Sequence, residues 1–301
     1  MDKKLLLIYN PNSGKGRFKE HLDDCLKIFK DSGYDPEVYE TKAPLDAEAY
    51  VSDHAHEFDR LVCAGGDGTL SEVVSGMMRS RKRIPIGMIA AGSQNDSAVG
   101  FKWPKDIKKA AALSISGREF LSDVGRLNDE YFTYVASFGA LSAISCFTSQ
   151  KAKKVLGVGA YLAEGVKQLL KMESYNMTVR FNDNEINGDF YLGLVTNAMS
   201  VGGFKGIAGN DVDLQDGLFE VLLLKKPDNI IEFSREVDSV LIHNKDNGEI
   251  LTAPVIRFKT DKVEFISEEP VQWVRDGENG GRHEKAVILN DQRAVSFITG
   301  F

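Results

Sequence analysis

Cysteine, basic charge and long apolar runs are all scarce in this sequence, and each shortage excludes a class of protein. The three cysteines, Cys25, Cys63 and Cys146, are widely spaced and form no Cys-x-x-Cys pair. They supply neither a disulfide framework nor a zinc site, which suits a reducing, cytoplasmic compartment. Lys and Arg total 37 against 44 for Asp and Glu, so the net charge is −7. A chain of that charge has no general electrostatic affinity for nucleic acid or for an anionic membrane.

The apolar runs are too short for a membrane-spanning protein. The N-terminal run, residues 5–9, falls far below the roughly 20 residues of a transmembrane helix and below the core of a signal peptide. We therefore expect no transmembrane segment, and we expect any contact with a membrane to be local and peripheral. The 301 residues are enough for one large or two ordinary domains.

Strand-like and helix-like segments alternate at short intervals in the first part of the chain. Apolar runs of strand length begin at Leu5, Pro36, Leu61 and Ile84, and segments with helical spacing of apolar residues lie between and after them. This alternation predicts an open, mostly parallel α/β sheet, in which ligands bind at the carboxyl ends of the strands. The predicted helices cover residues 18–29, 46–57, 70–77 and 106–116.

The pattern changes near residue 119 and predicts a β-rich second part. Strand-like segments at 119–127 and 131–138 are separated by Asn128-Asp129, a hairpin signal. One long helix is expected over 150–172, and short strands follow with turn signals between them. We expect an antiparallel sandwich or barrel, and a binding cleft where the two domains meet. The short strands cover residues 177–181, 191–196, 218–224, 255–259, 263–267 and 286–289.

The motif Gly65-Gly66-Asp67-Gly68-Thr69 follows a buried strand and precedes a helix. A strand that turns through glycines into a helix puts free backbone N–H groups and the positive helix end at one point, which is how proteins hold phosphate. A carboxylate beside a polyphosphate is repulsive unless a cation lies between them, so we expect Asp67 to bind Mg²⁺, directly or through water. The alternative is a tight turn in which Asp67 is the helix N-cap.

Two further loops at strand ends carry similar residues. The loop over residues 10–16 lacks the Gly-x4-Gly-Lys-Ser/Thr spacing of a P-loop, and its alternative interpretation is a polar connection with solvated basic side chains. The loop over residues 92–96 is suited to bonding a nucleotide or, alternatively, to capping the next helix. The candidate residues of the two loops are Asn10, Ser13, Lys15, Gly92, Ser93, Asn95 and Asp96.

Two acidic turns occur far downstream. Asp276-Gly277, just before Glu278, is a strong hairpin-turn signal. Residues 211–218 are rich in Asp and suggest Ca²⁺ or Mg²⁺, although the spacing is not that of an EF-hand.

Five of these elements, taken in order, resemble the motifs of one family. They are Asn10-Pro11-x-Ser13-Gly14-x-Gly16, Gly65-Gly66-Asp67-Gly68-Thr69, Gly92-Ser93-x-Asn95-Asp96, Asp216-Gly217-Leu218 and Asp276-Gly277-Glu278. Over nearly its whole length the chain resembles the soluble bacterial diacylglycerol kinase family, which shares its catalytic domain with sphingosine and ceramide kinases. The glycine-aspartate-glycine motif is also shared with NAD kinases and, more loosely, phosphofructokinases, whereas the last two elements favour the lipid-kinase branch.

The resemblance implies an ATP- and Mg²⁺-dependent lipid kinase. It would transfer the γ-phosphate of ATP to the hydroxyl of a lipid alcohol at a membrane surface, above all to diacylglycerol, giving phosphatidic acid. The implied fold is a Rossmann-like, NAD-kinase-like α/β domain, residues 1–125 with a C-terminal return over 294–301, and an antiparallel β-sandwich over 126–293. ATP would lie in the cleft between them. The oligomeric state is open, a homodimer included.

The resemblance also implies roles for single residues. Glu278 matches the general base on the lipid hydroxyl, and Asp67 and Asp96 would organise Mg²⁺ and phosphates. A structural cation site in the second domain is implied at Asp213, Asp216 and Leu218. The residues implied to hold the nucleotide are Asn10, Ser13, Lys15, Gly65, Gly66, Gly68, Thr69, Gly92, Ser93 and Asn95.

One loop departs from the family, because Ser97 and Val99 stand where the family has Phe and Arg. Two rival functions remain open. The first is a kinase of another acceptor, either a sphingoid lipid or NAD. The second is a non-catalytic regulator that binds ATP or lipid without turnover. A lipid kinase should respond to vesicles or micelles, whereas an NAD kinase should not.

Overall fold

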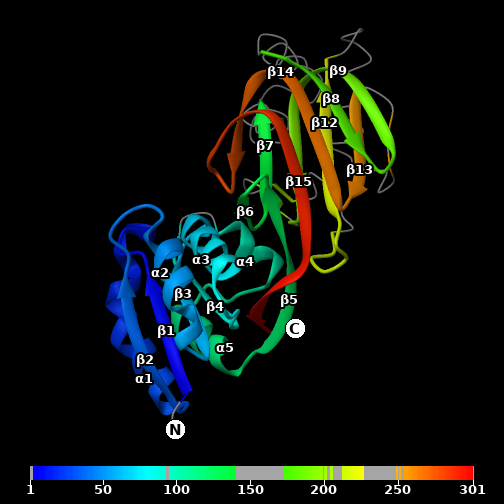
Figure 1. The fold of residues 1–301 in the computed structure, drawn as a ribbon. Coiled ribbons are helices and arrows are strands. Elements are labelled where there is room, and N and C mark those ends of the chain that lie inside the picture. Colours follow the sequence, from blue (N-terminus) through cyan, green and yellow to red (C-terminus); the bar gives the residue numbers. More distant parts are fainter. Residues whose placement is uncertain are drawn as a thin grey trace, which may run out of the picture.

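The computed structural model describes residues 3–92, 95–139, 173–198, 200–201, 204–205, 212–226, 249, 251 and 254–300. The helix expected over 150–172 lies outside these residues. Figure 1 shows an N-terminal part that contains the helices of the described residues and a second part in which the described elements are strands. Two long strands, β5 (Arg118–Leu127) and β15 (Glu278–Thr299), run between the two parts.

The N-terminal part has a parallel sheet between two layers of helices. Its strands are β1 (Lys3–Tyr9), β2 (Tyr34–Glu40), β3 (Arg60–Gly65) and β4 (Ile86–Ala90). Its helices are α1 (Leu22–Asp31), α2 (Asp46–His54), α3 (Asp67–Arg79), α4 (Asp96–Gly100) and α5 (Ile107–Ser116), with 3-10 turns η1 (Ser13–His21) and η2 (Ala55–Glu57). The strands pair in the order β2-β1-β3-β4, all parallel.

The sequence of β1 shows why this sheet is covered on both faces. Leu5 and Leu7 pack in one core with residues of α1 and α5, whereas Leu6 and Ile8 pack in a second core with residues of α2 and α3. A continuous apolar run of this kind is typical of a parallel strand that is buried on both sides. The predicted alternation of strands and helices is therefore confirmed in this part.

The second part is antiparallel. Its strands are β6 (Glu130–Phe132), β7 (Val135–Gly139), β8 (Tyr175–Phe181), β9 (Asn184–Thr196), β10 (Ser200–Val201), β11 (Phe204–Lys205), β12 (Phe219–Lys225), β13 (Val255–Thr260) and β14 (Lys262–Arg275). They enclose a core of their own. In it the ring of Trp273 meets those of Phe138 and Phe265 edge-on, with centroids 5.1 Å apart in both pairs.

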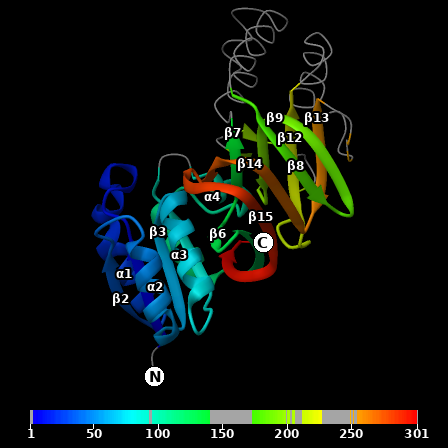
Figure 2. The same ribbon diagram turned by 45° about the horizontal axis from the view of Figure 1, so that its top comes forward.

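β15 joins the two parts by backbone pairing. Its first half pairs with β14, and Ile288 belongs to the core of the second part. Its last residues pair with the start of β5, and Phe297 lies beside Ile86 of β4. The pairing is irregular between Asp291 and Val295, a bulge that marks where the strand passes from one core to the other. In Figures 1 and 2, α3 and α4 lie on the side of the N-terminal part that faces the second part.

Two sequence predictions need correction. The strand expected over 131–138 is broken at Thr133-Tyr134, because their backbone N–H groups donate to the Asp276 carboxylate instead of to a neighbouring strand. The short strands expected at 263–267 and 286–289 are parts of the much longer β14 and β15, since antiparallel pairing extends through polar residues as well. Among the described residues, no helix has the length and apolarity needed to cross a bilayer.

Candidate functional site

The two glycine turns after β3 and β4 pack backbone against backbone. A Cβ on Gly92 would lie 2.5 Å from the Cα of Gly66, and a Cβ on Gly65 would lie 2.6 Å from the side chain of Thr69. Neither position leaves room for a side chain. The turns therefore bring unobstructed backbone to the carboxyl end of the parallel sheet, where a phosphate-binding site was predicted.

The Asp67 carboxylate holds these two turns together. Asp67 is the first residue of α3, but its oxygens accept the backbone N–H groups of Asp96 and Ser97, at 3.0 and 3.1 Å. It therefore caps α4, a different helix, and the alternative in which it is the N-cap of its own helix is wrong. Gly66 occupies that N-cap position.

The loop after β1 contacts the same glycine turn. The Asn10 side-chain amide donates to the hydroxyl of Thr69 at 3.3 Å, and its oxygen accepts the backbone N–H of Asn12 at 2.9 Å. Gly14 has φ +55°, and a Cβ there would lie 1.9 Å from the carbonyl oxygen of Ala91. The loops after β1, β3 and β4 thus meet at one edge. The backbone of Lys15 lies in η1.

The loop after β4 is closed by its own side chain. Asn95 has φ +56°, and its amide both accepts from the N–H of Gly92 and donates to the carbonyl of Gly92, at 3.0 and 2.9 Å. Asp96 follows as the buried first residue of α4. Ser93 lies outside the described residues.

The hairpin between β14 and β15 brings Glu278 to the glycine turn. Asp276 and Gly277 have φ +49° and +86°, and Arg275 pairs with Glu278, so the predicted two-residue Asp-Gly turn is confirmed. The Oε1 of Glu278 lies 3.5 Å from where a Cβ of Gly68 would stand. A carboxylate from the second part thus faces the start of α3.

A cleft of about 610 Å³ lies between these elements. The sequence-predicted residues that line it are Asn10, Ser13, Gly66, Gly68, Thr69 and Glu278; Gly65, Asp67, Gly92, Asn95 and Asp96 do not line it. The other lining residues are Asn12, Thr41, Lys42, Ala43, Pro44, Leu45, Glu48, Ser71, Glu72, Ser75, Arg275 and Asn279. None of these twelve residues was a candidate from the sequence. Polar residues at helical spacing among the apolar residues after Gly68 were the available signal for Ser71, Glu72 and Ser75.

Burial and, to a smaller extent, nearby carboxylates raise the pKa values of two groups near the cleft. Burial raises the pKa of Glu72, and the neighbouring Glu48 and Glu278 carboxylates add to the rise. Burial also raises the pKa of the Tyr134 hydroxyl, and the negative charges of Asp276, Asp67, Asp96 and Glu278 act in the same direction. Of the five charged residues that line the cleft, three are acids, Glu48, Glu72 and Glu278, and two are bases, Lys42 and Arg275.

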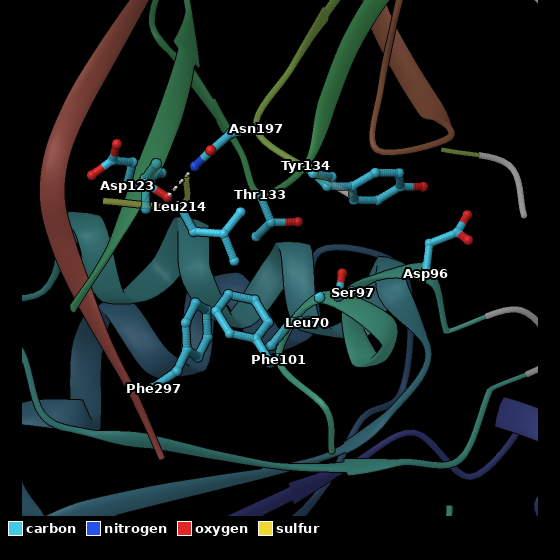
Figure 3. A pocket seen from close by; sticks show the side chains of 13 residues that line it. Leu70, Asp96, Ser97, Phe101, Asp123, Thr133, Tyr134, Asn197, Leu214 and Phe297 are labelled. Carbon is cyan, nitrogen blue, oxygen red and sulfur yellow. Dashed lines mark hydrogen bonds between the residues drawn. The ribbon is translucent and has the colours of Figure 1, made fainter. Parts of the chain in front are cut away.

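A small cavity of about 20 Å³ separates α4 from the second part (Figure 3). Asp96, Ser97 and Tyr134 line it on one side, and Asp123 and Asn197 line it on the other. The Asn197 amide donates to the Asp123 carbonyl at 3.4 Å. A volume of this size accommodates about one water molecule. No larger ligand fits here, so the 610 Å³ cleft is the candidate site.

The predicted structural cation site is a turn closed by local bonds. Asp213 accepts the N–H of Gln215 at 3.0 Å, and Asp216 accepts the N–H of Leu218 at 2.9 Å. The second oxygen of Asp216 lies 3.8 Å from the Lys259 ammonium. Over the part of the chain that the structure describes, no three His, Cys, Asp or Glu side chains converge as metal ligands. A cation at this turn stays a prediction.

Comparison with known proteins gives a consistent result. Residues 4–127 match the family model of the diacylglycerol kinase catalytic domain. The chain is 35% identical over 281 residues to a diacylglycerol kinase of Bacillus subtilis, covering 93% of this chain and 91% of the relative. It is 34% identical over 300 residues to one of Staphylococcus aureus, covering 98% and 92%.

A solved structure supports the fold. The crystal structure of a diacylglycerol kinase from Bacillus anthracis matches with a TM-score of 0.77 at 21% identity, over 99% of this chain and 97% of the other. The chain belongs to the bacterial diacylglycerol kinase family and is a lipid kinase.

Proposed function

We propose that this protein is an ATP- and Mg²⁺-dependent kinase that transfers the γ-phosphate to the hydroxyl of diacylglycerol, giving phosphatidic acid. One observation carries the proposal: the Oε1 of Glu278, a residue of the second part, lies 3.5 Å from the Cβ position of Gly68 in the glycine turn. The names of the relatives in Bacillus subtilis and Staphylococcus aureus support the choice of lipid.

The residues around the glycine turn fit a nucleoside triphosphate. Space that a Cβ would fill at Gly65 and Gly92 is already occupied, and the backbone is exposed to the cleft at Gly66 and Gly68. We assign the phosphates of ATP to this turn and to Asn10, with Thr69 held by Asn10. The other residues assigned to the nucleotide are Ser13, Lys15, Ser93, Asn95 and Asp96.

The donor set also fits Mg²⁺. Mg²⁺ is usually bound through one or two carboxylates together with waters and substrate phosphates, so a cage made only of protein ligands is not needed. Asp67, with Asp96 beside it, supplies such carboxylates, and each Asp67 oxygen keeps a lone pair beyond its hydrogen bond to α4. Mg²⁺ bound there would neutralise charge on the transferring phosphate. We also assign a structural cation to Asp213, Asp216 and the backbone of Leu218.

Glu278 is assigned as the general base. A carboxylate within reach of the acceptor hydroxyl takes its proton as the oxygen attacks the phosphorus, which adds roughly 10²–10⁴-fold to the rate. The hairpin fixes the backbone of Glu278, so the residue needs no rearrangement to face the glycine turn.

The finer architecture is part of the same proposal. We assign residues 1–125, with the return over 294–301, to a Rossmann-like nucleotide-binding domain, and residues 126–293 to a β-sandwich domain that receives the lipid. The lipid would reach the cleft while the protein contacts a membrane surface peripherally, either as a monomer or as a homodimer.

The test is phosphate transfer from labelled ATP with Mg²⁺ to a panel of acceptors. The panel holds diacylglycerol, monoacylglycerol, sphingosine and ceramide in mixed micelles, and NAD in buffer. Labelled phosphatidic acid is the expected product. Labelled sphingosine phosphate or labelled NADP would show that the acceptor is sphingosine or NAD and not diacylglycerol. ATP binding without any labelled product would favour a non-catalytic regulator.

A further inference from the structure

Leu45 has a backbone conformation that a leucine rarely adopts. Its φ is +66° and its ψ is 3°, in the left-handed region, where the Cβ of an L-residue is crowded by the backbone. The residue is also 60% exposed, although leucine is normally buried. Strained residues of this kind cluster at functional sites and persist only where the surroundings impose them.

The surroundings of Leu45 do impose this conformation. Asp46 accepts the backbone N–H of Lys42 at 2.8 Å and the hydroxyl of Tyr39 at 3.0 Å, which closes the loop on itself. From α3, the Glu72 carboxylate accepts the backbone N–H of Ala47, two residues after Leu45, at 3.2 Å. The loop is thus tied to both β2 and α3, and Leu45 is held with its side chain outward.

The side chain of Leu45 belongs to the small apolar part of the cleft lining. The apolar lining residues are Ala43, Pro44 and Leu45, which are consecutive, and apart from glycines every other lining residue is polar or charged. Because Glu72 accepts the N–H of Ala47, close to Leu45 in sequence, this patch lies beside the second turn of α3. Gly68 is four residues before Glu72, a rise of about 6 Å along the helix axis. The patch is therefore close to the glycine turn but displaced from it along the axis of α3, toward the C-terminal end of the helix.

We propose that Leu45, with Ala43 and Pro44, forms the platform on which the nucleobase of the phosphate donor lies. This inference rests on the proposed function, because it assigns the part of the donor beyond the phosphates. A planar heterocycle covers an area that a patch of three residues can match. A long acyl chain needs an extended apolar groove, whereas the rest of this lining is polar. Covering Leu45 with the base would remove exposed apolar surface from water.

Two substitutions separate the strain from the contact. L45G removes both the side chain and the strain, so the melting temperature should rise while ADP binding weakens by about 5- to 10-fold, the effect of losing a partly buried apolar contact. L45A removes the side chain and keeps the strain, so it should weaken ADP binding without the rise in melting temperature. V38A is the matched control, since Val38 is an exposed apolar residue of β2 that does not line the cleft.

Calorimetric titration with ADP and with tripolyphosphate, each with Mg²⁺, tests the assignment without requiring turnover. Tripolyphosphate has no base, so L45G and the wild type should bind it equally while differing for ADP. Equal ADP affinity in L45G and wild type would overturn the proposal and leave Leu45 a structural residue. If L45G leaves ADP affinity unchanged but alters how turnover depends on lipid concentration, the patch binds the acyl chain of the lipid and not the base. If the wild type transfers no phosphate to any acceptor, the proposed function fails, and the two titrations still decide the base contact.

Discussion

The Asp276 carboxylate accepts both the backbone N–H and the hydroxyl of Thr133, at 2.6 and 2.8 Å, across 143 positions of sequence. Its other oxygen accepts the N–H groups of Tyr134 and Val135, at 3.0 and 3.1 Å. Asp276 is buried, with 4% of its surface exposed. The hairpin between β14 and β15 carries Glu278. The Asp276 side chain anchors this hairpin to the strand break between β6 and β7.

We expect D276N to destabilise the fold by about 2–4 kcal/mol. The Asn side chain would turn its NH₂ group toward backbone N–H donors, which leaves buried donors unpaired. Urea unfolding of D276N and of E268Q, a change at an exposed acid of β14, measures the effect. A D276N midpoint equal to that of E268Q would contradict the role of Asp276 in fixing the hairpin.

We expect E278Q to lose roughly 10²–10⁴-fold in turnover, because an amide cannot take up the acceptor proton. ADP affinity should stay unchanged, since Glu278 comes from the second part and the phosphates are assigned to the N-terminal part. Initial rates with the best acceptor and calorimetric titration with ADP check the two halves of this prediction. Near-wild-type turnover in E278Q would remove Glu278 as the base.

D67N should act on both stability and metal dependence. An Asn oxygen would accept one of the two N–H groups of α4, while the Asn NH₂ group would repel the other. The free energy of unfolding should therefore fall by about 1 kcal/mol. The activity should also require more Mg²⁺, because a neutral amide is a poorer ligand for this cation. Thermal unfolding and a Mg²⁺ titration of the rate measure the two effects. If only stability changes, Asp67 is a capping residue and the Mg²⁺ assignment fails.

Glu220 should make stability fall as the pH rises. Burial raises its pKa to about 7, against the lowering effect of Lys259, whose ammonium lies 3.1 Å away. The folded protein then binds the proton more tightly than the unfolded chain, so stability is greatest below the unfolded pKa and declines until the pH has passed about 7. Removing the titrating group should remove this decline.

E220Q is the corresponding variant. When the pH is raised from 5 to 8, the free energy of unfolding of E220Q should increase relative to that of the wild type by about 2–3 kcal/mol, as the pKa shift implies. Urea midpoints at the two pH values, with E284Q as an exposed control on β15, measure the difference. If the urea midpoints of the wild type and E220Q differ by the same amount at both pH values, Glu220 does not titrate in this range.

Local sequence determined much of the N-terminal part. The apolar run of β1, the helical spacing along α3 and the glycines between β3 and α3 each act through neighbours within a few residues. Such patterns specify an element wherever the segment is placed, because backbone geometry and burial on one or both faces set the requirement. The Asp276-Gly277 turn is predictable for the same reason, since two adjacent residues with positive φ suffice to define it.

Only the tertiary structure decided how distant side chains are used. Asp67 stands where it could cap its own helix but caps α4, and the strand break at Thr133 depends on Asp276 far along the chain. The strain at Leu45 persists because Glu72, a distant residue of α3, holds the loop in addition to its own bond from Lys42 to Asp46. Hydrogen bonds of this kind depend on which segments the sheet brings together, and a pattern within one segment carries no information about its eventual partner.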